Sequence, residues 1–171
     1  MQADNISLSR KKWAITVRLF HWLGALLILS AWMTAEVFDN MSLHRSIGIS
    51  ILLWTAARLI NRFLVKAPPA PVMPKWQTGM SHLAHTGLYL SMLAMPISGL
   101  LMMMYADRET HFFNLFTVPV LVTPNDEYAE LFEKLHNDIW WVILLFLLGM
   151  HVVGALYHQF IQKDGLIKRM L

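Results

Sequence analysis

The chain has 171 residues, of which 56% are hydrophobic and only 15% are charged, and its mean hydropathy is +0.46. This composition excludes an ordinary soluble domain and indicates an integral membrane protein, for which we expect no nucleic-acid partner. The formal net charge is +3 and cysteine is absent. The absence of cysteine excludes disulfides, thiolate metal sites, cysteine-held iron–sulfur clusters and thioether-linked haem.

Four apolar segments are long enough to cross about 30 Å of hydrocarbon as helices. In chain order they are residues 17–38, 44–64, 82–105 and 139–160. The first begins too late and runs too long for a cleavable signal peptide, so we expect it to remain in the mature protein. The sequence therefore predicts an all-α fold, with a single four-helix membrane bundle over residues 1–171.

Basic residues gather on one side of this predicted bundle. Of the 14 lysines and arginines, only Arg45, Arg108 and Lys134 belong to the opposite side, which also carries nine acidic residues. The positive-inside rule therefore predicts that both termini are cytoplasmic and that the acidic side is external.

Two connections have a distinctive composition. Residues 67–75 contain four prolines, which favour an extended polyproline connection on the cytoplasmic side. The longest external connection, residues 106–135, includes an apolar stretch that is too short and too proline-broken to span the membrane. We expect it to lie on the outer membrane surface or over the helix ends, and we expect its His111 to be solvated.

Four of the eight histidines fall near the ends of the predicted helices. His21 and His44 open the first and second segments, and His136 and His151 lie at the two ends of the fourth. Ionisable residues inside a bilayer are costly enough to indicate function. Because successive helices alternate in direction, matching depths pair His44 with His136 and His21 with His151.

These spacings suit two stacked haems. His136 and His151 are separated by a rise of about 22 Å and by some 60° around the helix, so they share one broad face. A bundle interior can hold two planar macrocycles, each clasped between two neutral imidazoles that fill both axial positions. Gly24, Gly48 and Gly154 follow three of the four histidines by three or four residues, where a porphyrin can approach the backbone.

Other interpretations of the histidines remain open. A single histidine at a helix end is also compatible with an interfacial polar residue, and glycine is common in membrane helix packing. His158 lies seven residues after His151 on nearly the same face, and it competes as a ligand although it lies closer to the water boundary. His82 and His85 are compatible with iron ligation, with hydrogen bonds to haem propionates or with proton transfer to a quinone.

Arg58 and Arg62 lie one helical turn apart at the cytoplasmic end of the second segment. A guanidinium group binds a carboxylate through two parallel hydrogen bonds, so these residues suit haem propionates. They are equally compatible with basic residues that only set the topology of the helix.

Taken in order, the motifs of this chain resemble those of the bacterial cytochrome b561 family. The matching stretches are Arg-Leu-Phe-His-Trp at 18–22, His-Arg-Ser-Ile-Gly-Ile at 44–49, His-Leu-Ala-His at 82–85, Leu-Ala-Met-Pro-Ile-Ser-Gly-Leu at 93–100, and Leu-Ile-Lys-Arg-Met at 166–170. The resemblance covers nearly the whole chain.

The resemblance implies a multi-pass dihaem protein of the bacterial inner membrane. It implies that His21, His44, His136 and His151 are the axial ligands of two haem b groups, and that a quinone is the redox partner in the lipid phase. Some family members are superoxide oxidases, which pass an electron from external superoxide through haem to ubiquinone. The spacing from His136 to His151 is one residue longer than in the family, and a π-bulge would absorb the extra residue.

Three functions follow as hypotheses, and the sequence identifies no catalytic residue for any of them. The first is an oxidoreductase between an external donor, such as superoxide, and ubiquinone. The second is an electron-transfer or anchor subunit for a separate periplasmic redox protein. The acidic external side favours a basic partner of that kind and disfavours the superoxide anion. The third is a haem-free transporter or structural bundle that uses the histidines for protons or a metal.

Overall fold

The computed structural model of the protein describes residues 12–69 and 73–171. Three long helices come first: α2 (Ile15–Glu36), α3 (Met41–Leu64) and α4 (Lys75–Tyr105). A hairpin of β1 (Thr110–Phe112) and β2 (Phe116–Val118) follows. The last long helical segment is continuous and consists of α5 (Asp126–Lys134), the π-helix η1 (Leu135–Trp140), α6 (Trp141–Tyr157) and the π-helix η2 (His158–Gln162). A short 3-10 helix, η3 (Ile167–Arg169), follows this segment.

Four helical segments of the described chain are long and apolar enough to cross a membrane, which confirms the predicted all-α membrane bundle. The two-stranded hairpin is a small addition that the sequence analysis did not predict. Many large apolar side chains are exposed, whereas the interior combines apolar residues such as Ile51 and Met92 with hydroxyl-bearing ones such as Thr55 and Ser91, both 0% exposed. An apolar exterior of this kind suits a protein whose surroundings are lipid.

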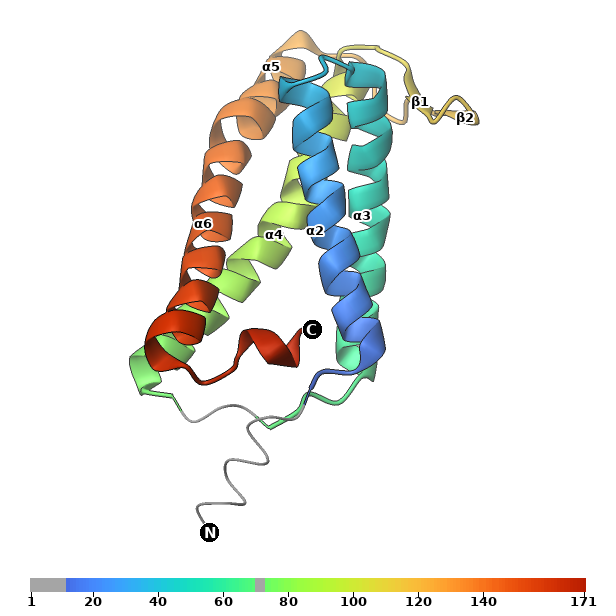
Figure 1. The fold of residues 1–171 in the computed structure, drawn as a ribbon. Helices are drawn as coiled ribbons and strands as arrows, with labels where there is room; N and C mark the ends of the chain where they lie inside the picture. The colour runs from blue at the N-terminus through green and yellow to red at the C-terminus, as the bar shows by residue number, and fades with distance from the viewer. Residues whose placement is uncertain (1–11, 70–72) are drawn as a thin grey trace.

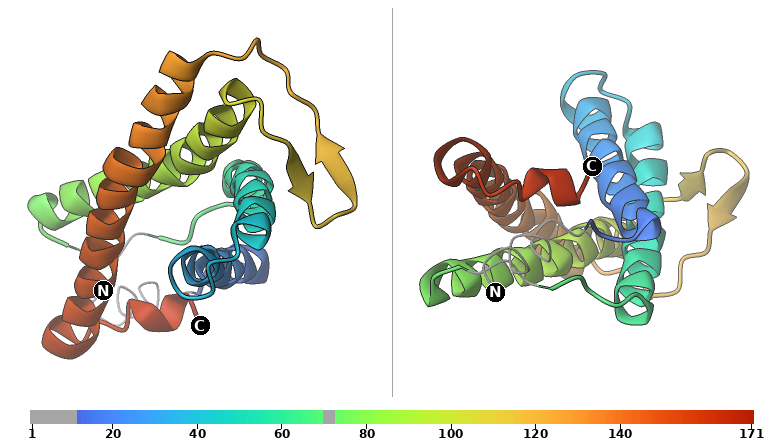
Figure 2. Two further views of the ribbon diagram at one scale, coloured as in Figure 1. Left: turned by 90° about the horizontal axis from the view of Figure 1, so that it is seen from above. Right: turned by 60° about the horizontal axis from the view of Figure 1, so that its bottom comes forward.

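The four helices form an incomplete ring in cross-section (Figures 1 and 2). α2 packs on α3, α3 on α4 and α4 on α6, whereas α6 makes little backbone contact with α2 or α3. We call the end that carries the α2–α3 turn, the hairpin and α5 the hairpin end. The opposite end, which carries residues 12–14, 65–69 and 163–171, is the terminal end.

Two helix starts differ from the prediction. α4 begins at Lys75 and not at residue 82, because the polar residues before the apolar stretch are also helical. Pro74, which has no backbone N–H to donate, stands at the N-cap of this helix. The last segment begins at Asp126 and not at residue 139. Asn125 caps that start by accepting a hydrogen bond from the Tyr128 amide, and two acidic residues occupy the first turn. The predicted connection 106–135 is therefore helical in its final part.

At the terminal end, the residues after α6 run back beneath the bundle toward the start of α2 (Figure 1, and the right view of Figure 2). The Trp13 amide donates to the carbonyl oxygen of Arg169 at 3.0 Å, and the Trp22 indole donates to that of Met170 at 2.8 Å. The Arg169 guanidinium, which is 4% exposed, donates to the Pro69 carbonyl at 2.7 Å. Burial lowers the pKa of Arg169, and the nearby Asp164 carboxylate opposes that shift. The polyproline connection predicted for 67–75 lies partly outside the described residues.

Candidate functional site

The structure brings the four predicted ligand histidines together in two pairs. At the terminal end, the ring centres of His21 on α2 and His151 on α6 are 6.0 Å apart. At the hairpin end, those of His44 on α3 and His136 on η1 are 6.1 Å apart. Both pairs cross the side of the bundle where α6 has few backbone contacts with α2 and α3. The partners in each pair are those that matching depths had indicated.

The spacing within each pair suits a metal ion bound between the rings. An imidazole nitrogen binds a metal at about 2 Å and its ring centre lies roughly 1 Å further back, so two axial imidazoles have centres roughly 6 Å apart. The observed separations of 6.0 and 6.1 Å match this value. The side chains present at both ends therefore fit the axial ligation of a haem iron.

Hydrogen bonds fix the tautomers of the pair at the hairpin end. Nδ1 of His44 donates to the Ala31 carbonyl on α2 at 2.9 Å, and Nδ1 of His136 donates to the Met95 carbonyl on α4 at 2.7 Å. A carbonyl oxygen only accepts, so each Nδ1 carries the proton. The lone pair of each Nε2 is consequently available for a metal.

The same two carbonyls also accept hydrogen bonds from buried hydroxyl groups. Thr34 Oγ1 donates to the Ala31 oxygen at 2.9 Å, and Ser98 Oγ donates to the Met95 oxygen at 2.8 Å. Each hydroxyl lies three residues after its carbonyl, and Thr34 and Ser98 are only 4% and 3% exposed. These supports were not predicted from the sequence. Their signal was a hydroxyl-bearing residue inside an apolar segment, which needs a buried partner.

His136 lies in the π-helix η1, at the position where the sequence analysis expected a local adjustment. A π-turn closes with one more residue than an α-turn. η1 can therefore hold one residue more than an α-helix of the same length, between a regular α5 and a regular α6.

Gly99 on α4 makes room for the His136 ring. A Cβ atom at residue 99 would lie 2.9 Å from both Cε1 and Nδ1 of His136, which is closer than real contacts allow. Any side chain at this position displaces the imidazole from the place where it bonds the Met95 carbonyl.

A guanidinium and a third imidazole lie next to the terminal-end pair. Nη2 of Arg58 lies 3.2 Å from Nδ1 of His21, and the ring of His85 is 5.3 Å from that of His151. Nδ1 of His85 donates to the Ser81 carbonyl at 2.6 Å. Arg58 also lies over the Tyr89 ring, 5.3 Å from its centre. Three imidazoles and one fixed positive charge thus meet at this end.

The hydrogen bond from Arg58 has a consequence for His21. A guanidinium only donates, so Nδ1 of His21 accepts and the proton of the neutral ring lies on Nε2. A metal can bind Nε2 only when the ring proton lies on Nδ1 instead. Ligation through Nε2 therefore requires the hydrogen bond from Arg58 to break. The freed guanidinium then remains beside the site, where it suits a haem propionate.

The other predicted site residues have different surroundings. Arg62 points to the Trp13 ring, 5.2 Å from its centre, and His158 donates to the Asp164 carboxylate at 2.5 Å. His82 is exposed on α4, one turn before His85. His111 is exposed, as predicted, and its Nδ1 lies 2.9 Å from Thr117 Oγ1.

The three glycines predicted to face a porphyrin are not equivalent. A Cβ atom at Gly48 or Gly154 would meet nothing within 4 Å. One at Gly24 would touch Trp54 and Arg58 at 3.6–3.7 Å, so Gly24 packs against α3. The approach of a porphyrin to Gly48 and Gly154 stays a prediction, and the space beside them leaves room for it.

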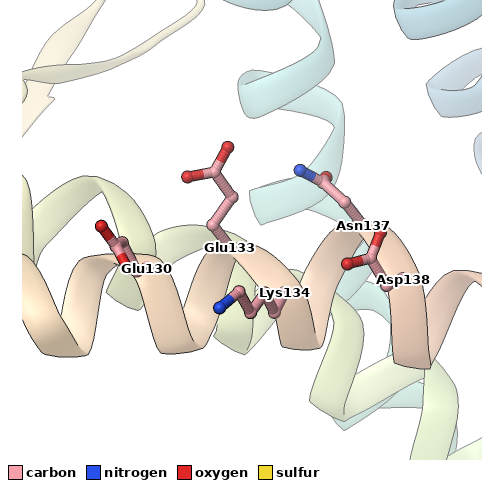
Figure 3. A pocket seen from close by; sticks show the side chains of 5 residues that line it. All are labelled: Glu130, Glu133, Lys134, Asn137 and Asp138. Carbon is pink, nitrogen blue, oxygen red and sulfur yellow. The ribbon is translucent and has the colours of Figure 1, made fainter.

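An acidic hollow of about 390 Å³ lies close to His136 along the chain (Figure 3). It is lined by residues of α5 and η1: Glu130, Glu133, Lys134, Asn137 and Asp138. Lys134 therefore lies among carboxylates. Arg45, beside His44 in sequence, has a guanidinium nitrogen 3.5 Å from the Glu109 carbonyl oxygen.

Comparisons with known proteins agree on one family. A family model described as prokaryotic cytochrome b561 matches residues 12–171. Cytochrome b561 homolog 1 of Escherichia coli K12 is 35% identical over 129 residues, which cover 75% of this chain and 72% of the relative. Cytochrome b561 homolog 2 of the same organism is 32% identical over 176 residues, covering 94% and 92%. A Yersinia pestis protein named probable superoxide oxidase CybB is 28% identical over 173 residues, covering 94% and 96%.

Proposed function

The chain belongs to the prokaryotic cytochrome b561 family of membrane electron-transfer proteins, and from that premise we propose that it holds two haem b groups and exchanges electrons with the quinone pool. The observation that carries this proposal is the presence of two facing imidazole pairs, each with the spacing of two axial ligands. Family membership implies b-type haem, which disfavours the haem-free transporter or structural bundle.

In the proposed arrangement His44 and His136 hold one haem, and His21 and His151 hold the other. Haem b bound between two imidazoles supplies reversible one-electron transfer. The Ala31 and Met95 carbonyls keep the protons of His44 and His136 on Nδ1. At the terminal end we assign Arg58 to a propionate, whereas Arg62 is directed toward Trp13.

The proposed orientation follows the basic residues. Those that set the topology lie at the terminal end, so this end faces the cytoplasm and the hairpin end faces outward in a bacterial inner membrane. The terminal-end pair is then closest to cytoplasmic protons. His85 and His158 are candidates for delivering protons there, because each has Nδ1 held by an acceptor, the Ser81 carbonyl and the Asp164 carboxylate respectively.

The leading reaction is the oxidation of superoxide coupled to reduction of ubiquinone. Two superoxide anions give up one electron each and leave as two molecules of dioxygen. One quinone takes the two electrons and two protons and becomes quinol. The support for this reaction is the relative named probable superoxide oxidase. The acidic hairpin end does not attract a superoxide anion.

That same acidic end favours a second candidate function. Glu130, Glu133 and Asp138 present carboxylates around the helix that carries His136 (Figure 3). A basic redox protein would be drawn to this face by complementary charge. In this second function the protein passes electrons to or from such a partner and does not itself act on superoxide.

The test uses purified protein with haem, a superoxide-generating system and a ubiquinone analogue. Reduction of the haem by superoxide, followed by reoxidation by quinone, supports the superoxide reaction. Reduction by quinol without any response to superoxide supports the partner-dependent function. If the haem is neither oxidised by quinone nor reduced by quinol, the result contradicts the proposal that the protein exchanges electrons with the quinone pool.

A further inference from the structure

The connection between α4 and α5 contains the hairpin, and its composition is unlike that of a water-exposed loop. Residues 110–125 contain no aspartate, glutamate, lysine or arginine. Charged residues border this stretch on both sides, at 107–109 and at 126–127. Several of its apolar side chains are open to the surroundings, among them Leu115 (77% exposed), Phe116 (56%) and Leu121 (76%).

Beyond the buried Thr110, the hairpin has one apolar face and one polar face. Successive strand residues point to opposite sides, and Phe112 pairs with Phe116 while His111 pairs with Thr117. The Phe112 and Phe116 rings lie 5.2 Å apart on one face. On the other face His111 and Thr117 are joined by a hydrogen bond of 2.9 Å.

The hairpin projects sideways from the bundle beside the start of α3, in every view of Figures 1 and 2. It therefore lies away from the helix interior and at the level where the spanning helices end. The exposed apolar residues Met41 and Leu43 occupy the first turn of α3. β1 packs against this helix. The hairpin therefore lies beside exposed apolar residues of α3.

We propose that this hairpin is an interfacial anchor whose apolar face and tip insert into the lipid leaflet at the hairpin end. The hairpin would lie at the boundary between the lipid headgroups and the acyl chains. This region accepts apolar side chains on one face of the hairpin and polar side chains on its other face. The lack of charge suits this depth, and the paired strands satisfy part of the backbone internally. This proposal rests on the membrane-spanning helices and does not depend on haem.

The anchor is tied rigidly to the helix that carries His44. Ser46, 2% exposed, accepts a hydrogen bond from the Phe113 amide at 2.9 Å, and its hydroxyl lies 3.1 Å from the His111 carbonyl oxygen. Ser46 is two residues after His44. Insertion of the hairpin into lipid therefore fixes the height of the first turns of α3 relative to the membrane surface.

The absence of native cysteine makes a direct test practical. Single variants Leu115→Cys, at the tip, and Phe116→Cys, on the apolar face, carry the environment-sensitive fluorophore NBD in lipid nanodiscs. Thr117→Cys, on the polar face of the same hairpin, is the matched control, and Glu127→Cys at the exposed start of α5 is the aqueous control. Quenching by doxyl-labelled lipid and bleaching by dithionite report contact with lipid and with water.

We expect the probes at 115 and 116 to emit at shorter wavelength, to be quenched several-fold more strongly by doxyl lipid, and to bleach more slowly than those at 117 and 127. Behaviour of the probes at 115 and 116 equal to that at 117 and 127 would overturn the anchor. A shielded probe at 115 that doxyl lipid does not quench, together with disulfide formation between two copies of the unlabelled Leu115→Cys variant, would assign this surface to self-association and also overturn it. Because two positions are probed independently, misfolding of one variant leaves the other decisive.

Discussion

At the residue scale, the proton on an imidazole decides whether that ring binds iron. His44 and His136 each donate Nδ1–H to a backbone carbonyl, so each Nε2 is ready to act as a ligand. Side-chain spacing in the sequence indicated which histidines form pairs, but it carried no information on these carbonyls. Ala31 and Met95 contribute only backbone atoms, so their side chains give no signal of this role.

Gly48 offers a prediction that separates haem binding from ordinary packing. Gly48→Leu should abolish the haem at the hairpin end, because the side chain enters the space through which the porphyrin approaches the backbone. The protein alone should tolerate it, since a Cβ atom there meets nothing within 4 Å. Haem content and far-UV circular dichroism measure the two effects.

Gly149→Leu is the matched control for that variant, because Gly149 is equally free of contacts but faces outward. It should keep both haems. Equal haem content in the two variants would mean that Gly48 does not face a porphyrin.

Gly99→Ala should weaken the binding of the haem at the hairpin end, because it displaces the His136 ring. A Cβ atom would lie 2.9 Å from two ring atoms, so the Nδ1 bond to Met95 is lost or strained. Loss of a hydrogen bond that orients a metal-binding histidine typically costs roughly 10- to 100-fold in affinity. Haem titration of the apoprotein measures the change, and Gly79→Ala, where the added atom meets nothing, should leave affinity unaltered.

At the scale of the elements, η1 sets the register between the two histidines of the last segment that we propose as ligands. His136 and His151 are 15 residues apart, and the π-turn near His136 takes up one residue more than an α-turn would. Only the resemblance to the family suggested such an adjustment from the sequence. The continuity of α5, η1 and α6 was not predicted, because the acidic residues of α5 appeared as part of a connection.

Deletion of Asn137 should therefore leave both haems bound. Asn137 is an exposed residue of η1, and its removal lets the π-turn become an α-turn with the ligands in the same register. Insertion of one alanine between Leu145 and Phe146 should instead release a haem, because it turns His151 by about 100° relative to His136. Haem quantification of both variants tests this. Retention of two haems after the insertion would contradict a rigid register.

At the scale of the whole molecule, the sequence predicted the class of fold and the pairing of the four histidines. Apolar length identified the four spanning helices, and alternation of helix direction assigned each histidine a depth. The hairpin was not predicted, since its strands have only three residues each. The position of Arg58 beside His21, with Arg62 turned toward Trp13, also required the three-dimensional packing.

The pairing predicts which haem each substitution affects. His44→Ala and His136→Ala should remove the same reduction step from a potentiometric titration, and His21→Ala and His151→Ala should remove the other. The reason is that each pair shares one iron in the proposed arrangement. His111→Ala is the control and should keep both steps, because His111 contacts neither pair. Loss of the same step from all four variants would contradict separate sites.

The most direct measurement of the central claim is the haem content of the purified, haem-replete protein, together with its reduced-minus-oxidised visible spectrum. Two ring pairs with the spacing of axial ligands predict two b-type haems per chain, both low-spin and six-coordinate. A single haem, or a five-coordinate spectrum that binds carbon monoxide readily, would contradict ligation by both histidine pairs.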